Sequence, residues 1–526
     1  MIKTDLKLPY RYTQDSIKDA ISECLPISKQ EIKDIRILKR ELTVKDGVPF
    51  YKTTVAFSSD AEKENGLLKI RNRVFPYQSE EFTVQASSFD TRPVVAGSGP
   101  AGLFAALTLA ESGACPIVIE RGLDVDSRKK KIDTFNKLGV LDTECNVQFG
   151  EGGAGTYSDG KLKTGAKDEY KYKVLREFVD GGADETILYS TSAHLGTDKL
   201  PGIVKYIREK IISLGGEFIF SAKLTDLSVR DCSLVSIKYE KDGEAVELSC
   251  DTLILATGHS ARDTFLMLKE KGVSMKSKGF GIGMRMEHPR EYINKIVYRD
   301  AASLIEESAS YHLVTHLPSG RSVYSFCMCP GGEVVAATSE HGAIVTNGMS
   351  EYARMADNSN AAILVSVNPE DFGSDDPLAG IEMQRRIERA AYGLSDSYKA
   401  PSIRLARLLD KNADAGFCGV NPSYPIGVVE ASPYDYLPGY IPTSIKEAMP
   451  DFDAWLRGYS YVDAVLTGPE TRTTSPVRIE RESDGCSPGL QGIYPTGEGA
   501  GYAGGIVSSA VDGIKMALKA IEKHLK

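Results

Sequence analysis

Short apolar runs alternate with amphipathic and glycine-rich stretches along this chain, and the clearest example lies at residues 92–122. Val94-Val95-Ala96 has the pattern of a buried strand, and three glycines at the spacing GxGxxG follow it before an Ala/Leu-rich helical stretch. A second apolar run, Ile117 to Ile119, ends on the acidic residue Glu120. The pattern predicts a parallel strand–helix–strand unit of the kind that binds a dinucleotide.

Each glycine of this unit has its own expected role. Gly97 allows a tight turn, Gly99 allows the backbone to approach a pyrophosphate, and Gly102 allows the helix to pack closely on the strand. The N-terminus of the helix offers free N–H groups to phosphates. Glu120 is placed to accept hydrogen bonds from ribose hydroxyls, and its charge disfavours a cofactor with a 2′-phosphate.

Two later stretches repeat the combination of a buried strand and a glycine turn. Leu253 to Leu255 leads into Ala256-Thr257-Gly258, and Ile493 to Pro495 leads into a turn that begins at Gly497. An amphipathic helix is predicted from Gly505 onward, because apolar residues recur there on one stripe. Its N-terminus is a second expected anion site.

A further glycine-rich stretch lies between these strands. Five glycines occupy the eleven positions from 150 to 160, a density that excludes a stable helix or strand interior. A flexible surface loop is one interpretation. The presence of Phe149 and Tyr157 favours a loop that runs along a flat cofactor and presents backbone N–H groups to it.

The whole pattern indicates an α/β fold with several domains, because 526 residues are too many for one ordinary core. Residues 1–90 are predicted to form a small α/β domain of ferredoxin-like character, with a helix at 15–25 and strands at 35–38 and 50–57. The predicted domains are that N-terminal domain at 1–90, the first part of a Rossmann-like domain at 91–279, an inserted mixed α/β substrate domain at 280–465, and the C-terminal part of the Rossmann-like domain at 466–526.

Charge and hydropathy indicate which partners and which cellular compartment to expect. A net charge of −9 and a pI near 5.5 argue against nucleic acid as the main partner. The basic run Arg128 to Lys131 is read as a solvated helix face, although Arg128 lies close enough in sequence to the Glu120 turn to reach a cofactor phosphate. No apolar run approaches the roughly 20 residues of a membrane span, and no apolar segment follows the N-terminal charges. We therefore expect a cytoplasmic protein.

Cysteine and histidine usage gives few candidates for catalysis. The nine cysteines are mostly scattered, which indicates neither a disulfide framework nor a zinc or iron–sulfur site, and no metal site is expected. Cys327 and Cys329 are the exception, because alternate residues of a strand project to the same side. They form either a redox pair, one thiol near a cofactor, or two buried structural thiols.

Two other groups could take part in proton transfer or substrate binding. Arg285, Glu287 and His288 lie together and could bind an anionic substrate or relay a proton; the alternative is a surface charge cluster at a strand end. His341 is a further candidate proton donor, because histidine changes protonation near neutral pH.

Three of these segments together resemble a known superfamily. The GSGPAG turn with Glu120, the LILATG segment at 253–258 and the IYPTGEGAGYAGG segment at 493–505 are similar to the cofactor segments of FAD-dependent oxidoreductases of the glutathione-reductase type. The chain lacks both the second GxGxxG domain and the CxxxxC pair of the disulfide reductases in that superfamily. The resemblance thus implies a single FAD site.

Within the superfamily, the chain most resembles the uncharacterised bacterial FAD-dependent dehydrogenases, or NAD(FAD)-utilising dehydrogenases, that carry an extra N-terminal domain. The segments FGEGGAGTYSDGKL at 149–162, VYSFCMCPGGEVV at 323–335 and TNGMS at 346–350 carry this match. It covers nearly the whole chain, more loosely over the first 90 residues.

The resemblance implies a set of positions that hold FAD without a covalent bond. Gly497 and Glu498 would meet the ribityl-phosphate region, and the helix after Gly505 would point its positive end at the flavin. The expected cofactor-binding residues are Gly97, Gly99, Pro100, Ala101, Gly102, Glu120, Arg121, Arg128, Gly152, Gly153, Ala154, Thr257, Gly258, Gly497, Glu498, Gly504, Gly505 and Ile506.

These observations favour a FAD-dependent oxidoreductase that transfers hydride or electrons to or from a small organic substrate. NADH or NADPH is expected to bind only transiently as the reductant, or electrons arrive from a partner protein. A flavin-dependent RNA-modifying enzyme is an alternative, against which the acidic charge counts. A non-enzymatic FAD-bound sensor or scaffold is the third interpretation.

Overall fold

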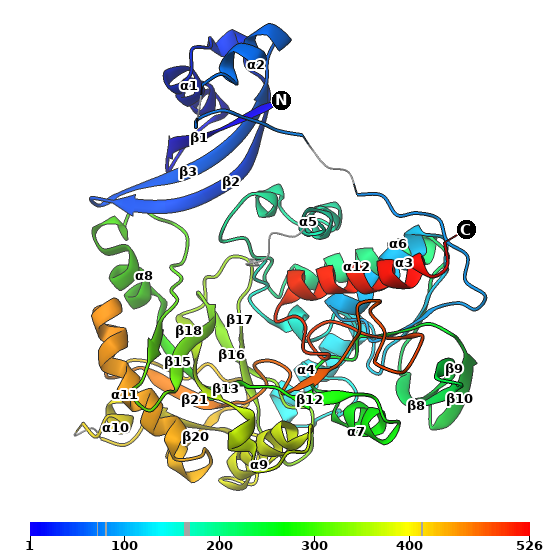
Figure 1. Ribbon diagram of the computed structural model, residues 1–526. Helices are drawn as coiled ribbons and strands as arrows, with labels where there is room; N and C mark the ends of the chain where they lie inside the picture. The colour runs from blue at the N-terminus through cyan, green and yellow to red at the C-terminus, as the bar shows by residue number, and fades with distance from the viewer. Residues whose placement is uncertain (71, 79–81, 163–168, 412–413, 526) are drawn as a thin grey trace.

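The computed structural model describes residues 1–70, 72–78, 82–162, 169–411 and 414–525, and it confirms the mixed α/β class. The N-terminal residues form a four-stranded antiparallel sheet in the order β2-β3-β1-β4, with the β-α-β-β-α-β connectivity of ferredoxin-like folds. Figure 1 shows this sheet and its helices as a distinct unit. It contacts the rest of the chain at Arg40, whose backbone hydrogen-bonds to Tyr189 and Thr191, and at Tyr51, whose hydroxyl donates to Glu307. Its elements are β1 (Ile2–Pro9), α1 (Gln14–Cys24), a 3-10 turn (Lys29–Glu31), β2 (Lys33–Lys45), β3 (Val48–Ser58), α2 (Ala61–Leu67) and β4 (Phe75–Pro76).

A five-stranded parallel sheet forms the nucleotide-binding part, in the order β23-β11-β5-β6-β7. Chain order reverses at β5, so the strand before the GxGxxG turn lies at the switch point of the sheet. The first and last parts of the chain thus contribute neighbouring strands. The strands are β5 (Val94–Ala96), β6 (Ile117–Ile119), β7 (Glu217–Ile219), β11 (Leu253–Leu255) and β23 (Ile493–Pro495).

Alternate residues of these strands enter two different cores. Val95 and Val118 pack against helices on one face, whereas Val94 and Ile117 pack against an antiparallel three-stranded sheet and α7 on the other. Figure 1 shows α3, α6 and α12 stacked on the helical face. The elements are α3 (Pro100–Glu111), α4 (Val125–Leu138), a 3-10 turn (Ala154–Tyr157), α5 (Lys171–Asp180), a 3-10 turn (Glu185–Leu188), α6 (Leu200–Ser213), β8 (Lys223–Arg230), β9 (Ser233–Lys241), β10 (Glu244–Ser249), α7 (Arg262–Glu270) and α12 (Ile506–Glu522).

A seven-stranded mixed sheet forms the second large unit, in the order β14-β15-β18-β13-β21-β19-β20. Its strand β21 extends through Glu470, so this sheet continues past the predicted boundary at residue 465. The strands are β13 (Phe280–Pro289), β14 (Val314–His316), β15 (Ser322–Cys329), β18 (Asn358–Val367), β19 (Ala400–Arg404), β20 (Val428–Glu430) and β21 (Val465–Glu470).

Helices and a short hairpin complete this unit, and α11 packs its apolar side on the sheet. The two chain segments that connect the large units run side by side, because β12 pairs antiparallel with β22. The remaining elements are β12 (Met275–Ser277), α8 (Arg290–Tyr298), a 3-10 turn (Arg299–Ala301), β16 (Glu333–Ala336), β17 (Thr346–Met349), a 3-10 turn (Pro369–Phe372), α9 (Ala379–Gly393), α10 (Leu405–Leu408), a 3-10 turn (Pro433–Asp435), α11 (Tyr440–Trp455) and β22 (Val477–Ile479).

None of the helices in the described residues is both long and apolar enough to cross a membrane.

Candidate functional site

A cavity of about 390 Å³ lies where the carboxyl ends of the parallel strands face the seven-stranded sheet. Its first side consists of the turns that follow β5, β6, β11 and β23, which is where open α/β sheets bind ligands. Its second side carries side chains from the other sheet and its hairpin. The residues of that second side are Phe326, Cys327, Asn347, Glu470, Arg472 and Thr473.

The glycines of the first turn differ in why they are needed. Gly97 has a φ of 103°, and a Cβ there would overlap the Ala256 carbonyl oxygen. A Cβ at Gly102 would overlap the Gly97 carbonyl oxygen, so β5 and α3 leave no room for a side chain. Gly99 is different, because a Cβ there would meet nothing nearer than the Gly153 Cα at 3.7 Å. The fold itself therefore has room for a Cβ at Gly99.

Two helices begin at the wall of the cavity without a capping side chain. Gly99 precedes α3 and Gly505 precedes α12, and both glycines line the cavity. Neither helix has an acidic residue in its first turn. Since the first N–H groups of a helix lack partners within it, both helices present positive dipole ends to an anionic ligand.

Glu120 ends β6 and is buried at the cavity wall. One carboxylate oxygen accepts hydrogen bonds from the backbone N–H and the hydroxyl of Ser98, at 2.9 and 2.7 Å. The other accepts from the N–H groups of Gly122 and Gly150, at 2.9 and 3.0 Å. Glu120 thus fixes three turns around the cavity, and a ribose hydroxyl would have to share its oxygens with them.

Arg128 does not reach the cavity, which corrects the expected contact with a phosphate. Its fully buried guanidinium lies behind the glycine-rich loop, and burial lowers its pKa. The loop carbonyls turn toward it, since folding leaves them no water to bind. It donates to the carbonyl oxygens of Asn146, Val147, Gly150, Glu151 and Gly153.

Most of the other expected cofactor residues do line the cavity. Those on its wall are Gly97, Gly99, Pro100, Ala101, Glu120, Arg121, Gly153, Ala154, Thr257, Gly258, Glu498, Gly504, Gly505 and Ile506. Gly102, Gly152 and Gly497 lie behind it, like Arg128. A Cβ at Gly497 would come within 2.6 Å of the Ala101 Cβ, and one at Gly152 would overlap the Thr156 hydroxyl oxygen. These glycines allow close packing behind the wall.

Cys327 and Cys329 meet at a distortion of β15. The strand has a bulge between Phe326 and Cys329, and Cys327 has a φ of 41°. Cys327 lines the cavity, whereas Cys329 is fully buried. A side-chain hydrogen bond between the thiols lowers the pKa of Cys327 and raises that of Cys329. The two thiols are adjacent, as predicted, but through a bulge rather than through regular strand alternation.

Arg285 and Glu287 project from the same side of β13 but do not line the cavity. Arg285 is fully buried and donates two hydrogen bonds to Glu470, at 2.6 and 2.8 Å, and one to the Cys327 carbonyl oxygen at 2.7 Å. Glu287 accepts from Ser423 and Asn358, and burial raises its pKa to about 7. Arg285 is therefore placed to support the second side of the cavity rather than to bind substrate, whereas the partners of Glu287 do not line the cavity.

Neither predicted histidine reaches the cavity, so we correct both expectations. His288 points to the opposite side of β13 from Arg285, where its Nε2 lies 2.8 Å from the Tyr459 carbonyl oxygen. Burial lowers the pKa of His288 to about 4, so it is neutral at pH 7. His341 is exposed on a turn, with its Nδ1 3.4 Å from the Tyr398 hydroxyl.

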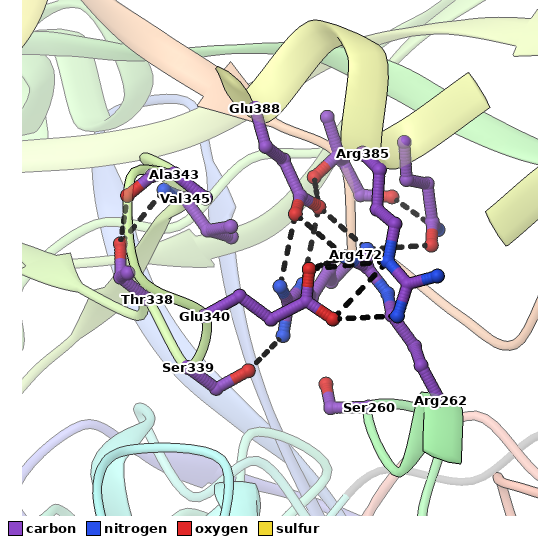
Figure 2. Close-up of polar contacts among 12 residues, drawn as sticks. Ser260, Arg262, Thr338, Ser339, Glu340, Ala343, Val345, Arg385, Glu388 and Arg472 are labelled. Carbon is purple, nitrogen blue, oxygen red and sulfur yellow. Dashed lines mark hydrogen bonds and ion pairs between the residues drawn. The ribbon is translucent and has the colours of Figure 1, made fainter. Parts of the chain in front are cut away.

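A buried ionic cluster adjoins the cavity. Figure 2 shows Glu388 between the guanidinium groups of Arg262 and Arg472. Glu388 lies 2.8 and 2.9 Å from Arg262 and 2.9 and 3.1 Å from Arg472, and Glu340 pairs with Arg262 and Arg385. Burial alone would raise the pKa of Glu388, but the two guanidinium groups outweigh it and lower the pKa. The cluster thus fixes Arg472 at the cavity wall.

His259 lines the cavity next to this cluster. Burial, together with the charges of Arg472 and Arg262, lowers its pKa to about 3. Its Nδ1 lies 3.1 Å from the Ser260 hydroxyl. His259 is therefore neutral at physiological pH and offers a hydrogen-bonding ring rather than a charge.

Comparisons with known proteins identify the family. The family described as "FAD-dependent protein, C-terminal domain-like" matches residues 279–473. An uncharacterised protein of Clostridium beijerinckii is 44% identical over 515 residues, which cover 96% of each chain. The chain belongs to this family of FAD-dependent proteins. The predicted relationship to uncharacterised FAD-dependent proteins is confirmed.

Solved flavoprotein structures are also similar to this FAD-dependent protein. A flavoprotein/dehydrogenase from Cytophaga hutchinsonii is 12% identical, with 82% of this chain and 79% of that chain covered and a TM-score of 0.34. A 3-ketosteroid dehydrogenase from Rhodococcus jostii RHA1 is 14% identical, with 85% and 100% covered and a TM-score of 0.35. Both TM-scores are low, so neither likeness bears on the substrate.

The residues of the cavity fit FAD chemically. The uncapped N-termini of α3 and α12 suit a diphosphate and an electron-rich ring, and both helices begin directly at the wall. The room at Gly99 gives independent support, because packing within the protein does not require a glycine there. The carboxylate of Glu120, at the end of β6, suits a ribose without a 2′-phosphate.

Sequence reasoning missed several residues of the wall, notably Lys161, His259, Asn347, Glu470 and Arg472. His259 directly follows the Thr257-Gly258 turn, and Lys161 ends the glycine-rich loop, so their positions were signals that could have been used. Glu470 and Arg472 had no such signal. They reach the cavity through the pairing of β21 with β13, which the sequence pattern does not specify.

Proposed function

We propose that this FAD-dependent protein is an oxidoreductase that holds FAD without a covalent bond and exchanges hydride or electrons with a small organic substrate. The observation that supports it is the two-sided cavity. Glycine turns and two uncapped helix N-termini form one side, and ionisable and thiol side chains form the other. A cofactor on the first side would leave the second side to the substrate.

The residues of the first side have the binding roles. In this proposal the N-terminus of α3 binds the diphosphate, Glu120 orients the ribose, and the N-terminus of α12 stabilises negative charge on the ring. FAD, when bound, supplies two-electron transfer. Glu498 carries a carboxyl in the turn after β23, and burial raises its pKa to about 7. It can hold or release a proton near neutral pH, which suits acid–base work beside the ring.

The residues of the second side would orient the substrate. Asn347 and Glu470 both pair with Arg285, so their side chains are fixed at the wall. Lys161 donates to the Met328 carbonyl oxygen, which ties the glycine-rich loop to the bulge in β15. A polar, rigid wall of this kind favours a substrate with hydrogen-bonding groups over a purely apolar one.

The decisive test is anaerobic reduction of the purified protein after reconstitution with FAD. We expect a flavin absorbance spectrum that persists through gel filtration and that is bleached by NADH or NADPH, or by a reduced electron-transfer protein if the nicotinamides fail. Release of free FAD on denaturation would show that the cofactor is not covalent. A protein that stays colourless after reconstitution contradicts the binding site, and bound FAD that no donor reduces contradicts the oxidoreductase.

A further inference from the structure

We propose that Cys327 and Cys329 form a thiol–disulfide exchange site that opens into the cavity, with Cys327 as the attacking thiol and Cys329 as the resolving thiol. The expected reactant is a low-molecular-weight disulfide. This activity goes beyond the proposed flavin function and needs no FAD for its first turnover. It assigns different roles to two thiols that the sequence presents as equivalent.

The difference in access between the two sulfurs is the first observation. Cys327 lines the cavity and is partly exposed, whereas Cys329 is fully buried directly behind it. The Cys329 Sγ lies 3.2 Å from the Cys327 carbonyl oxygen, so the two residues are in direct contact. All nine cysteines are free thiols. In such an arrangement the accessible thiol can form a mixed disulfide with a reactant, and the buried thiol beside it can then displace the reactant.

The backbone around Cys327 is held in an unusual conformation. A φ of 41° is uncommon for a residue other than glycine and is kept only where the surroundings fix it. The Cys327 carbonyl oxygen accepts hydrogen bonds from Arg285 at 2.7 Å and from the Cys329 thiol at 3.2 Å. Lys161 binds the next carbonyl oxygen, that of Met328. These contacts hold the Cys327 sulfur at the cavity wall.

The charges around the pair favour a thiolate at Cys327. Besides the contribution of Cys329, the positive groups Arg285 and Lys161 lower the pKa of Cys327, while burial and the Asp159 carboxylate raise it. The thiolate, not the thiol, is the nucleophile in disulfide exchange. The titratable groups that face Cys327 are Cys329, Arg285 of β13, Lys161 and Asp159 of the glycine-rich loop, Glu470 of β21 and Glu498 after β23.

The exchange proceeds in two balanced steps. The Cys327 thiolate attacks one sulfur of a disulfide RSSR, which forms a mixed disulfide at Cys327 and releases RS⁻. Cys329 then loses its proton and attacks the Cys327 sulfur, which forms the Cys327–Cys329 disulfide and releases a second RS⁻. Protonation of the two released thiolates gives two RSH. The dithiol is oxidised by two electrons, and the disulfide RSSR is reduced by the same two.

Bis(2-hydroxyethyl) disulfide is a suitable uncharged probe for the full-length, reduced protein. We expect the peptide that holds both cysteines to lose two hydrogens, as read by mass spectrometry. The Cys329→Ser variant should instead accumulate a 2-hydroxyethyl mixed disulfide at Cys327, and the Cys327→Ser variant should form neither product in this peptide. A wild-type protein that stops at the mixed disulfide, or a Cys329→Ser variant that accumulates none, would overturn the proposal.

Alkylation by iodoacetamide at pH 6 gives a second measurement that does not depend on disulfide formation. Cys327 should react at least about tenfold faster than the exposed thiols Cys24, Cys232 and Cys418, since only a thiolate reacts appreciably. Cys418→Ser is the matched control, because that thiol is exposed beside Arg404 but has a raised pKa. In the Cys418→Ser variant, Cys327 should be labelled as fast as in the wild type. Slower labelling of Cys327 than of Cys418 in the wild-type protein contradicts the proposed role.

Both measurements should be made with and without bound FAD. The exchange is expected in both states, so a protein that exchanges but binds no FAD would contradict the flavin function alone. A protein that binds and reduces FAD but never forms the Cys327–Cys329 disulfide would contradict the exchange site alone.

Discussion

The two sides of the cavity differ in the groups that they would offer to a ligand. The first side, built from the turns after β5, β6, β11 and β23, offers mainly backbone N–H groups and helix ends, and its shape depends on glycines such as Gly97 and Gly102 that leave no room for Cβ atoms. The second side, built from the seven-stranded sheet and its hairpin, offers side chains that are fixed by buried partners such as Arg285 and Glu388.

Because of this difference, a substitution is expected to act differently on the two sides. On the first side most substitutions act by filling space, because most of the groups that would bind a ligand belong to the backbone; side chains such as Glu120 and Glu498 are the exceptions. On the second side a substitution acts by leaving a buried charge without its partner, which costs much more than the contact itself contributes. The two sides are therefore expected to respond to substitution separately.

Arg285→Met should have the largest effect, because it leaves Glu470 buried without its bidentate partner. We expect the free energy of unfolding in urea to fall by about 3–5 kcal/mol. The matched control is Arg176→Met, which breaks an exposed pair with Asp180 and should cost about 0–1 kcal/mol. The surviving folded protein should still bind FAD. Loss of FAD at a stability equal to the control would show that the two sides are coupled.

Gly102→Ala and Gly99→Ala divide the first side into packing and binding. A Cβ at Gly102 would overlap the Gly97 carbonyl oxygen, so we expect a loss of about 1–3 kcal/mol in the FAD-free protein. Gly99 has room for a Cβ, and its substitution should cost less than about 1 kcal/mol there.

For FAD affinity, in contrast to stability, we expect the Gly99 substitution to matter strongly. Gly99→Ala is expected to weaken FAD binding by about tenfold or more, which corresponds to about 1.4 kcal/mol, because the methyl group stands where a phosphate would approach. Equilibrium titration followed by flavin fluorescence measures it. Unchanged affinity for FAD in Gly99→Ala would contradict the assignment of the diphosphate to this turn.

Much of the first side could be predicted from the sequence because its signals are local. A strand, a glycine turn and a helix follow one another within about a dozen residues, and Gly97, Gly258 and Gly505 all lie where their turns were expected to bind. The same reasoning failed for Arg128. A basic residue close in sequence to a phosphate-binding turn looks the same in the sequence whether its side chain faces the ligand or the loop carbonyls. Arg128 faces the loop carbonyls.

The second side was largely hidden because it depends on strand order. Arg262, Glu388 and Arg472 are far apart in the chain and meet only after the sheet is formed, so no spacing predicts their cluster. His288 shows the related difficulty within one strand. His288 was considered at a strand end and in fact lies within β13, but whether a strand residue faces the core or the cavity is decided by what packs on each face.

Glu498→Gln should have the smallest effect and tests an ionisable group in the glycine turn after β23. Burial raises the pKa of Glu498 to about 7, although Lys278 opposes the shift. Between an unfolded pKa of about 4.5 and that value, the folded protein holds more protons than the unfolded one, so the free energy of unfolding falls as pH rises through this window. Gln cannot ionise, so the variant should lose this decline and exceed the wild type above pH 7, by on the order of 1 kcal/mol.

Glu480→Gln provides a control of opposite sign in the same region. A side-chain hydrogen bond with Lys276, together with one from Ser274, lowers the pKa of Glu480. A lowered carboxyl pKa stabilises the fold above the unfolded value and loses that contribution as pH falls, so this variant should lose stability at neutral pH rather than gain it. Urea unfolding of the FAD-free proteins at pH 5 and pH 8 separates the two. If Glu498→Gln also loses stability at pH 8, its carboxylate has a favourable partner there, and the first side depends on side chains in the way the second side does.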